Sequence, residues 1–172
     1  EGATITDVDG HSYLDLLGEY SAGIYGHSHP AIRAAVELAL ETGVNMGAHH
    51  GKEVELAEAV TRRFNLDLVR FTNSGTEANM MALSAARCFT AKKKIMSMGG
   101  GYHGGTLYFS HGPSPVNAPF ETVMARFNDI ESTRGLVRKH AGELAAVILE
   151  PMLGGGGCLP ADKEFLAMLR AE

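Results

Sequence analysis

Hydrophobic residues in the first third of the chain follow first a strand-like and then a helical spacing. Two apolar runs flank Asp9-Gly10, a pair that favours the tight turn of a β-hairpin. Apolar positions three and four residues apart then predict a helix that Pro30 opens and Gly43 closes, and a second helix after it. The predicted elements are a hairpin with strands over 5–7 and 13–16, a loop over 18–28, and helices over 30–42 and 52–64.

From residue 68 onward, short apolar runs alternate with helical patterns. Strands are predicted over 68–72, 94–98, 122–127 and 144–149, and helices over 76–89, after Asn128, and over 163–170. Asn128 with Glu131 three residues later resembles a capping box, and Asp162 can cap the last helix. The run 144–149 is apolar throughout, as expected of a strand buried on both faces. This alternation predicts an α/β sandwich around a largely parallel sheet.

Composition limits the classes of function. The chain has 172 residues and a formal net charge of −5, which argues against a general nucleic-acid binder. No apolar stretch approaches the length of a membrane span, and two cysteines, Cys88 and Cys158, form no disulfide framework, so we expect a cytoplasmic protein. The 21 glycines cluster at 99–101, 104–105 and 154–157, which indicates loops that approach a ligand closely.

The strongest local signal for chemistry is Ser74-Gly75-Thr76, between a predicted strand and a predicted helix. Unpaired N–H groups and a partial positive charge at a helix N-terminus suit a phosphate, and the two hydroxyls add donors. Ordinary capping of the helix by Ser74 or Thr76 explains the same residues. The segment is neither a P-loop nor a dinucleotide fingerprint, since it lacks the residues that define them.

Two further signals follow predicted strands. Gly101-Tyr102-His103-Gly104 places an aromatic ring between glycines, where it can stack on a flat heterocycle or simply pack on the surface. Glu150 ends the most apolar strand, either as a hydrogen-bond partner inside a site or as a structural acid. Because ligands of open parallel sheets bind at the carboxyl ends of the strands, we expect all three signals at one edge.

Other chemistries lack support in the sequence. The pairs His27/His29 and His49/His50 do not have the spacing of a zinc helix, and no Cys-x-x-Cys is present, so we expect no metal site. Histidines that close loops by hydrogen-bonding the backbone explain these pairs better. Serine hydrolysis is unsupported because no Gly-x-Ser-x-Gly elbow occurs.

Taken together, these motifs resemble the class III aminotransferases, which use pyridoxal 5'-phosphate. The resemblance rests on five segments in register over nearly the whole chain, and the branch around glutamate-1-semialdehyde aminomutase is most similar. The segments are Asp7-Val8-Asp9-Gly10, Gly26-His27-Ser28-His29-Pro30, Asn73-Ser74-Gly75-Thr76-Glu77-Ala78, Gly101-Tyr102-His103-Gly104 and Glu150-Pro151. It implies a three-layer α/β/α sandwich of the aspartate-aminotransferase type (fold type I), with residues 1–48 as an N-terminal hairpin, loop and helix segment and 49–172 as part of the large cofactor-binding domain.

The resemblance also implies roles for matching positions. Ser74, Gly75 and Thr76 would hold the cofactor phosphate, Tyr102 would stack on the pyridine ring with support from His103, and Glu150 would lie near that ring. Tyr20 would face the substrate pocket. These six cofactor positions and Tyr20 complete the expected site within this chain.

Two positions depart from the family pattern, and the chain does not reach the family's Schiff-base lysine. Glu19 stands where the aminomutase branch often has a small hydroxyl residue, which weakens the case for aminomutase specificity. Gly155 replaces a glutamate that members acting on ω-amino acids carry. The Schiff-base lysine of the family would lie beyond Glu172, and all six lysines present occupy polar helix or turn contexts.

The sequence therefore predicts the front part of a transaminase or aminomutase that acts on an amino acid or amine and an oxo compound, is dimeric when complete, and is inactive as this chain alone. We expect exposed apolar surface where the remainder would pack. One alternative is a truncated, non-catalytic paralogue that serves as a binding or oligomer-interface module. Another is an unrelated α/β domain that binds a phosphosugar or nucleotide.

Overall fold

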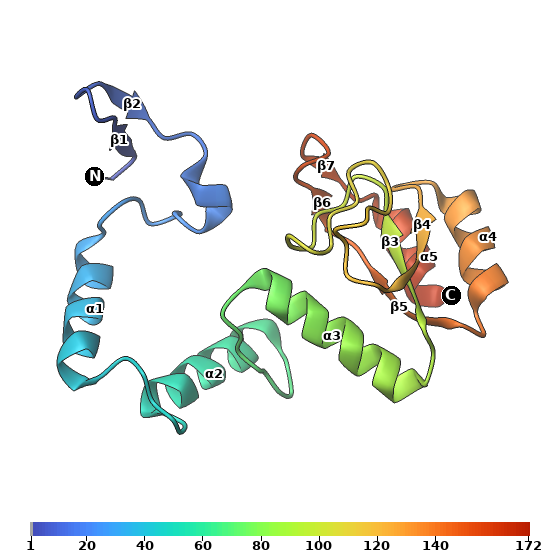
Figure 1. Ribbon diagram of the computed structural model, residues 1–172, viewed down its shortest axis with the longest axis horizontal. Coiled ribbons are helices and arrows are strands. Elements are labelled where there is room, and N and C mark those ends of the chain that lie inside the picture. Colours follow the sequence, from blue (N-terminus) through green and yellow to red (C-terminus); the bar gives the residue numbers. More distant parts are fainter. Residues whose placement is uncertain (1) are drawn as a thin grey trace. The chain divides into compact units, whose positions relative to one another are not determined.

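The computed structural model describes residues 2–172, which divide into two compact units with the boundary between Val69 and Arg70 (Figure 1). The domain division expected between residues 48 and 49 stays a prediction. Along residues 2–172, none of the helices combines the length and apolarity that crossing a bilayer requires.

The first unit begins with the predicted hairpin. Strand β1 (Thr4–Thr6) pairs antiparallel with β2 (Ser12–Leu14), and Asp7 organises the turn because its Oδ1 accepts the N–H groups of Asp9 and His11 at 3.0 and 2.9 Å. After the 3₁₀ helix η1 (Gly18–Ser21), helices α1 (Pro30–Thr42) and α2 (Gly51–Phe64) follow, close to their predicted bounds.

Local chemistry explains where these two helices start and stop. Pro30 occupies the first position of α1, where its missing N–H costs nothing, and Gly43 ends the helix at φ 104°. None of the described residues of this unit is buried, and the apolar stripes of both helices are exposed or half-buried. The expected exposed apolar surface is therefore present, for example at Ile32 and Val36.

The second unit holds a parallel three-stranded sheet in the order β4-β3-β5. The elements in chain order are α3 (Gly75–Thr90), β3 (Lys94–Met98), β4 (Glu121–Ala125), α4 (Ile130–His140), β5 (Leu144–Ile148), β6 (Met152–Leu153), β7 (Leu159–Pro160) and α5 (Lys163–Ala171). Strands β6 and β7 form a separate antiparallel pair. Because β3, β4 and β5 run parallel, the loops that follow them leave from one edge of the sheet (Figure 1).

Side chains of β3 alternate between two hydrophobic clusters, one on each face of the sheet. Ile95 packs with Leu83 of α3, whereas Met96 and Met98 pack with residues of α4 and α5, including the fully buried Phe165. Full burial of each such side chain stabilises the fold by about 1.5–3 kcal/mol. Helices therefore cover both faces, as the α/β/α prediction requires.

The predicted strand over 68–72 does not form. A strand is held by its hydrogen-bond ladder, and none of the strands within residues 2–172 pairs with this segment. Leu68 is exposed, so the segment also lacks the burial that would favour an extended core strand. It runs without regular structure into the start of α3.

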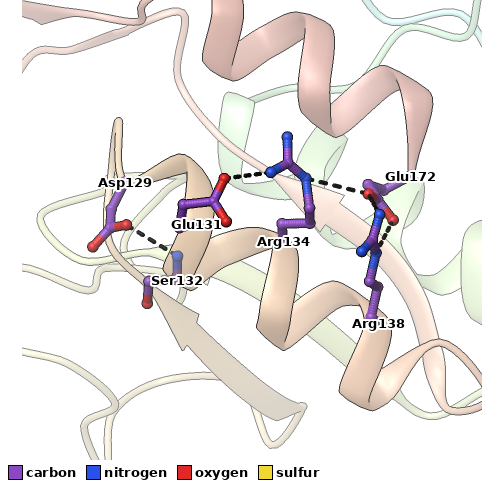
Figure 2. Close-up of polar contacts among 6 residues, drawn as sticks. All are labelled: Asp129, Glu131, Ser132, Arg134, Arg138 and Glu172. Carbon is purple, nitrogen blue, oxygen red and sulfur yellow. Dashed lines mark hydrogen bonds and ion pairs between the residues drawn. The ribbon is translucent and has the colours of Figure 1, made fainter.

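The predicted capping box at Asn128 is also wrong, by one residue. Asp129 is the N-cap of α4, and its Oδ1 accepts the N–H of Ser132 at 3.0 Å (Figure 2). Asn128 instead has φ 62° and bridges to the loop before α5, donating to the Pro160 carbonyl and accepting from the Asp162 N–H. Asp162 precedes α5 as expected, but its side chain makes no capping hydrogen bond.

Helices α4 and α5 are joined by an ionic network at one end (Figure 2). Arg138 Nε donates to Glu172 Oε2 at 2.9 Å, and Arg134 contacts both Glu172 and Glu131. The hydrogen bond from Arg138, followed by its charge, lowers the pKa of the Glu172 carboxyl below its ordinary value. This network fixes the end of α5 to α4 beside the sheet.

Candidate functional site

The start of α3 is shaped by reciprocal capping. Ser74 is the N-cap, in extended conformation, and its Oγ accepts the N–H of Glu77 at 3.2 Å. The Glu77 carboxylate in turn accepts the N–H of Asn73 at 2.7 Å. This pair of bonds is close to a capping box, except that the carboxylate binds the residue before the N-cap, so the capping alternative describes the local structure correctly.

The capping bonds leave hydrogen-bond donors available at this helix end. A hydroxyl has one O–H donor and two acceptor lone pairs. Ser74 Oγ accepts from Glu77, and Thr76 Oγ1 accepts from the N–H of Gly105 at 3.2 Å, so each O–H proton remains able to donate outward. Together with the partial positive charge of the first helical turn, this arrangement suits an anion.

The loop after β3 lies directly against the start of α3. Gly104 has φ +121°, and a Cβ placed on it would stand 2.3 Å from Thr76 Oγ1 and 2.7 Å from Thr76 Cα. Asn79, one turn further along α3, donates from Nδ2 to the carbonyl of His103 at 2.9 Å. Only glycine fits here, because the backbone of this loop touches the helix.

Two neighbours hold Tyr102. Its backbone N–H donates to Glu150 Oε2 at 2.9 Å, and the other carboxylate oxygen of Glu150 accepts the N–H of Gly154 at 3.3 Å. The ring of Tyr102 meets that of Tyr108 edge to face, with centroids 5.3 Å apart and planes at 74°. Glu150 thus ties the loops after β3 and β5 together, while about half of the Tyr102 surface stays exposed.

The side chain of His103 is buried, and its imidazole is neutral. Its ring packs near Phe109, with centroids 6.4 Å apart. Burial lowers the pKa of the His103 imidazole, and the nearby negative charge of Glu150 opposes that change only in part. Its Nε2 has no hydrogen-bond partner among residues 2–172. His103 therefore belongs to the wall of the site rather than to its exposed surface.

A pocket of about 340 Å³ joins the two segments. Its volume falls in the range of small-molecule sites. It is lined by Ser74, Gly75, Thr76, Asn79, Tyr102, His103 and Gly104. The structure thus brings five of the six expected cofactor residues to one pocket. The sixth, Glu150, accepts the backbone N–H of Tyr102. Their binding roles remain predictions.

One further expected residue does not line this pocket, and two residues that were not expected contact the site. Tyr20 lies in the first unit, exposed, with φ 52°, and its role in a substrate pocket stays a prediction. Asn79 and Tyr108 contact the site but were not among the expected residues. Asn79 leaves a signal in the sequence, since it is a poor helix former placed three residues after Thr76 on the same helix face. We find no comparable signal for Tyr108.

The histidines of the first unit are occupied by local contacts. His29 and His50 accept backbone N–H groups at the starts of α1 and α2, as expected of loop-closing histidines. His27 and His49 instead pair with the carboxylates of Asp15, at 2.8 Å, and Glu53, at 3.0 Å, so the backbone explanation is wrong for these two.

Two clusters of carboxylates with a histidine occur in the first unit, one formed by Asp7, Asp9 and His11 and one by Asp15, Glu19 and His27. In each, the central aspartate already accepts several hydrogen bonds. Asp15 Oδ1 accepts the N–H groups of Leu17 and Gly18, both at 2.9 Å, and these bonds lower the pKa of its carboxyl, with a further contribution from His27. Asp7 and Asp15 therefore each stabilise a local turn.

Comparison with known proteins places this chain among aminotransferases. The Aminotransferase class-III family matches residues 1–171. Beta-phenylalanine transaminase of Variovorax paradoxus is 47% identical over 171 residues, which cover 99% of this chain and 39% of that protein. A crystal structure of a beta-phenylalanine aminotransferase from that organism has a TM-score of 0.96 at 46% identity, covering 99% of this chain and 40% of the other.

Aminomutases of the expected branch are also similar. Glutamate-1-semialdehyde 2,1-aminomutase of Chlorobaculum tepidum is 40% identical over 186 residues, which cover 99% of this chain and 43% of that protein. A transaminase structure with pyridoxal phosphate bound has a TM-score of 0.90 at 37% identity, covering 99% of this chain and 44% of the other. The chain spans about 40% of the length of the relatives it matches. On the family match and the fold together, this chain belongs to the class III aminotransferases.

Proposed function

We propose that this chain forms the phosphate cup and the ring-facing wall of the pyridoxal phosphate site in a longer transaminase or aminomutase. The observation that supports this most directly is the pocket between Ser74–Thr76 and Tyr102, at the edge where the strands of the sheet end. The complete protein would transfer an amino group between an amino acid or amine and an oxo compound.

The residues present fit the cofactor. Its phosphate would meet the free O–H donors of Ser74 and Thr76 and the N–H groups of the first turn of α3, where the helix carries partial positive charge. Its flat ring would meet the exposed part of Tyr102, whose edge-to-face contact with Tyr108 leaves room for stacking. When bound, pyridoxal phosphate acts as the electron sink for chemistry at the amino-bearing carbon.

This chain contributes position and electrostatics rather than the base. Glu150 holds the backbone of Tyr102, and the buried side chain of His103 forms part of the pocket lining. The lysine that would bind the cofactor covalently belongs to the part of the protein beyond this chain. We further propose a cytoplasmic homodimer as the complete enzyme. Both cysteines are free and exposed, as a reducing compartment permits.

A comparison of two ligands tests the phosphate cup. Pyridoxal 5'-phosphate and pyridoxal differ only in the phosphate. Ser74→Ala and Thr76→Val in the intact protein should therefore lower the affinity for pyridoxal 5'-phosphate and leave the affinity for pyridoxal unchanged. Hydrogen bonds to charged groups contribute about 1.5–3 kcal/mol, which corresponds to roughly 10- to 150-fold in affinity. Titration of the apo protein, followed by absorbance, measures both. Equal losses for the two ligands would refute the assignment.

The matched control is Ser132→Ala. Ser132 also lies at a helix start, but it uses its backbone N–H and not its hydroxyl in the cap, so its removal should leave both affinities unchanged. Activity is tested by incubating the loaded intact protein with single amino acids and measuring the pyridoxamine phosphate formed. The 172-residue chain alone should show neither this conversion nor borohydride-trapped cofactor. Trapping on this chain would contradict the proposed division of roles.

A further inference from the structure

We infer that Asn79 is a positioning residue that fixes the Tyr102 loop to the phosphate-binding turn and thereby sets the orientation of the Tyr102 ring toward the cofactor. This inference rests on the proposed function, because the ring acts on a cofactor only if one binds. It assigns a role to a side chain of α3 that neither holds the phosphate nor stacks on the ring.

The contact is a bond between segments far apart in the sequence. Asn79 Nδ2 donates to the carbonyl of His103 at 2.9 Å, across 24 residues. A carbonyl can only accept, so the orientation of the Asn79 amide is dictated by its partner. Asn79 is half-buried and lines the pocket beside Thr76, three residues earlier on the same face of α3.

Asn79 and Thr76 bind the loop on either side of a single residue. Thr76 Oγ1 accepts the N–H of Gly105, Asn79 donates to the carbonyl of His103, and Gly104 between them lies with its backbone against Thr76. Two hydrogen bonds with opposite polarity therefore hold the peptide groups before and after Gly104. A loop held at both points cannot rotate about Gly104 without breaking one of them.

The carbonyl that Asn79 binds belongs to the residue directly after Tyr102. Glu150 binds the N–H of Tyr102, and Asn79 binds the carbonyl of the next residue, His103. The backbone of Tyr102 is thus tied on one side to the end of β5 and on the other to α3, the helix whose first turn carries the phosphate donors. Removing the Asn79 bond would leave the loop held against α3 through the bond from Gly105 to Thr76, on the far side of Gly104 from the ring.

The identity of the residue supports this role. Asparagine in a helix interior is a poorer helix former than alanine, so Asn79 makes α3 locally less stable than alanine would. Alanine, by contrast, would remove the donor and leave the His103 carbonyl without this partner. Aspartate has nearly the same shape but offers only acceptors when ionised, which makes it a stringent test of the donor.

The experiment uses the intact protein with the variants Asn79→Ala and Asn79→Asp, and with Ser84→Ala, an exposed position on α3, as the matched control. Hydrogen exchange of the apo protein reports on the loop, and circular dichroism in the absorption band of bound pyridoxal 5'-phosphate reports on ring orientation. We expect both Asn79 variants to exchange the amides of residues 101–107 about fivefold faster, the change that corresponds to one net hydrogen bond. Exchange in α4 and α5 should stay unchanged.

The cofactor signal separates positioning from mere stability. In the Asn79 variants saturated with pyridoxal 5'-phosphate, the dichroism per bound cofactor should fall to half or less of the wild-type value, whereas Ser84→Ala should match wild type. Unchanged exchange or an unchanged dichroic signal would overturn the inference. A wild-type protein that binds no pyridoxal 5'-phosphate would instead refute the proposed function, so the two failures are distinguished.

Discussion

The substitution Gly104→Ala would place a methyl group where the Tyr102 loop meets α3. The added Cβ would stand 2.3 Å from Thr76 Oγ1, 2.7 Å from Thr76 Cα and 2.7 Å from Thr76 Cβ. One of these atoms belongs to the backbone of a helix, so rotation of a side chain cannot relieve the clash. The backbone at Gly104 also has φ +121°, a conformation that L-residues rarely adopt.

Both effects destabilise the native contact. A residue held in a conformation reserved for glycine costs about 1–3 kcal/mol. Overpacking adds about 1–3 kcal/mol. Separation of the loop from α3 relieves both costs but loses the hydrogen bond between Gly105 and Thr76, worth about 1 kcal/mol, and opens the pocket. We therefore expect a loss of about 2–5 kcal/mol in the free energy of unfolding, or a displaced loop with weakened pyridoxal phosphate binding.

The neighbouring glycine supplies the control. A Cβ on Gly105 meets no atom within 4 Å, and its φ is not in the positive range, so Gly105→Ala should change stability by less than about 0.5 kcal/mol. Urea unfolding followed by far-ultraviolet circular dichroism, with cofactor titration of the same preparations, measures both variants. If Gly104→Ala unfolds and binds like Gly105→Ala, the close approach of loop and helix described above is incorrect.

Three further predictions concern the second unit. Thr133→Val keeps the shape of a fully buried side chain but removes its hydrogen bond to the Arg126 carbonyl, so urea unfolding should show a loss of about 1–2 kcal/mol; an unchanged midpoint would contradict this. Because the pKa of Glu172 is lowered by Arg138, the contribution of Glu172 to stability is complete above its ordinary pKa of 4.5 and is lost as the pH falls through the lowered value. The difference in unfolding midpoint between wild type and Glu172→Gln should accordingly be present at pH 7 and disappear in acid, and a difference that persists there would refute the ion pair. The pKa of His103 is lowered by burial, so the stability of the wild type should decline as the pH falls below 6.5 toward that lowered value, whereas His103→Gln should lack this component; parallel pH profiles would show that His103 is not buried as described.

Local patterns were sufficient for most elements. Hydrophobic spacing located the helices, and Pro30 and Gly43 marked the ends of one of them, because helix periodicity and terminal chemistry act within a few residues. The parallel sheet was predictable from alternating strands and helices. The strand over 68–72 failed because pairing depends on a neighbour, which an apolar run does not reveal. The cap at Asp129 was missed because Asn128 carries an equally good capping side chain, which the fold uses to reach the segment before α5.

For the candidate site too, some features were predictable from the sequence and others were not. The sequence indicated the hydroxyl-rich turn at Ser74–Thr76 because it begins a helix, whose N-terminus suits an anion. It indicated the aromatic residue among glycines and the carboxylate after an apolar strand because both follow parallel strands, whose carboxyl ends gather ligands. Only the tertiary structure decided how these segments touch: the fit of Gly104 against Thr76, the bond from Asn79 to His103, and the two N–H groups gathered by Glu150. These contacts join residues far apart in the chain, and their existence depends on ångström-scale packing of loops that no local spacing encodes.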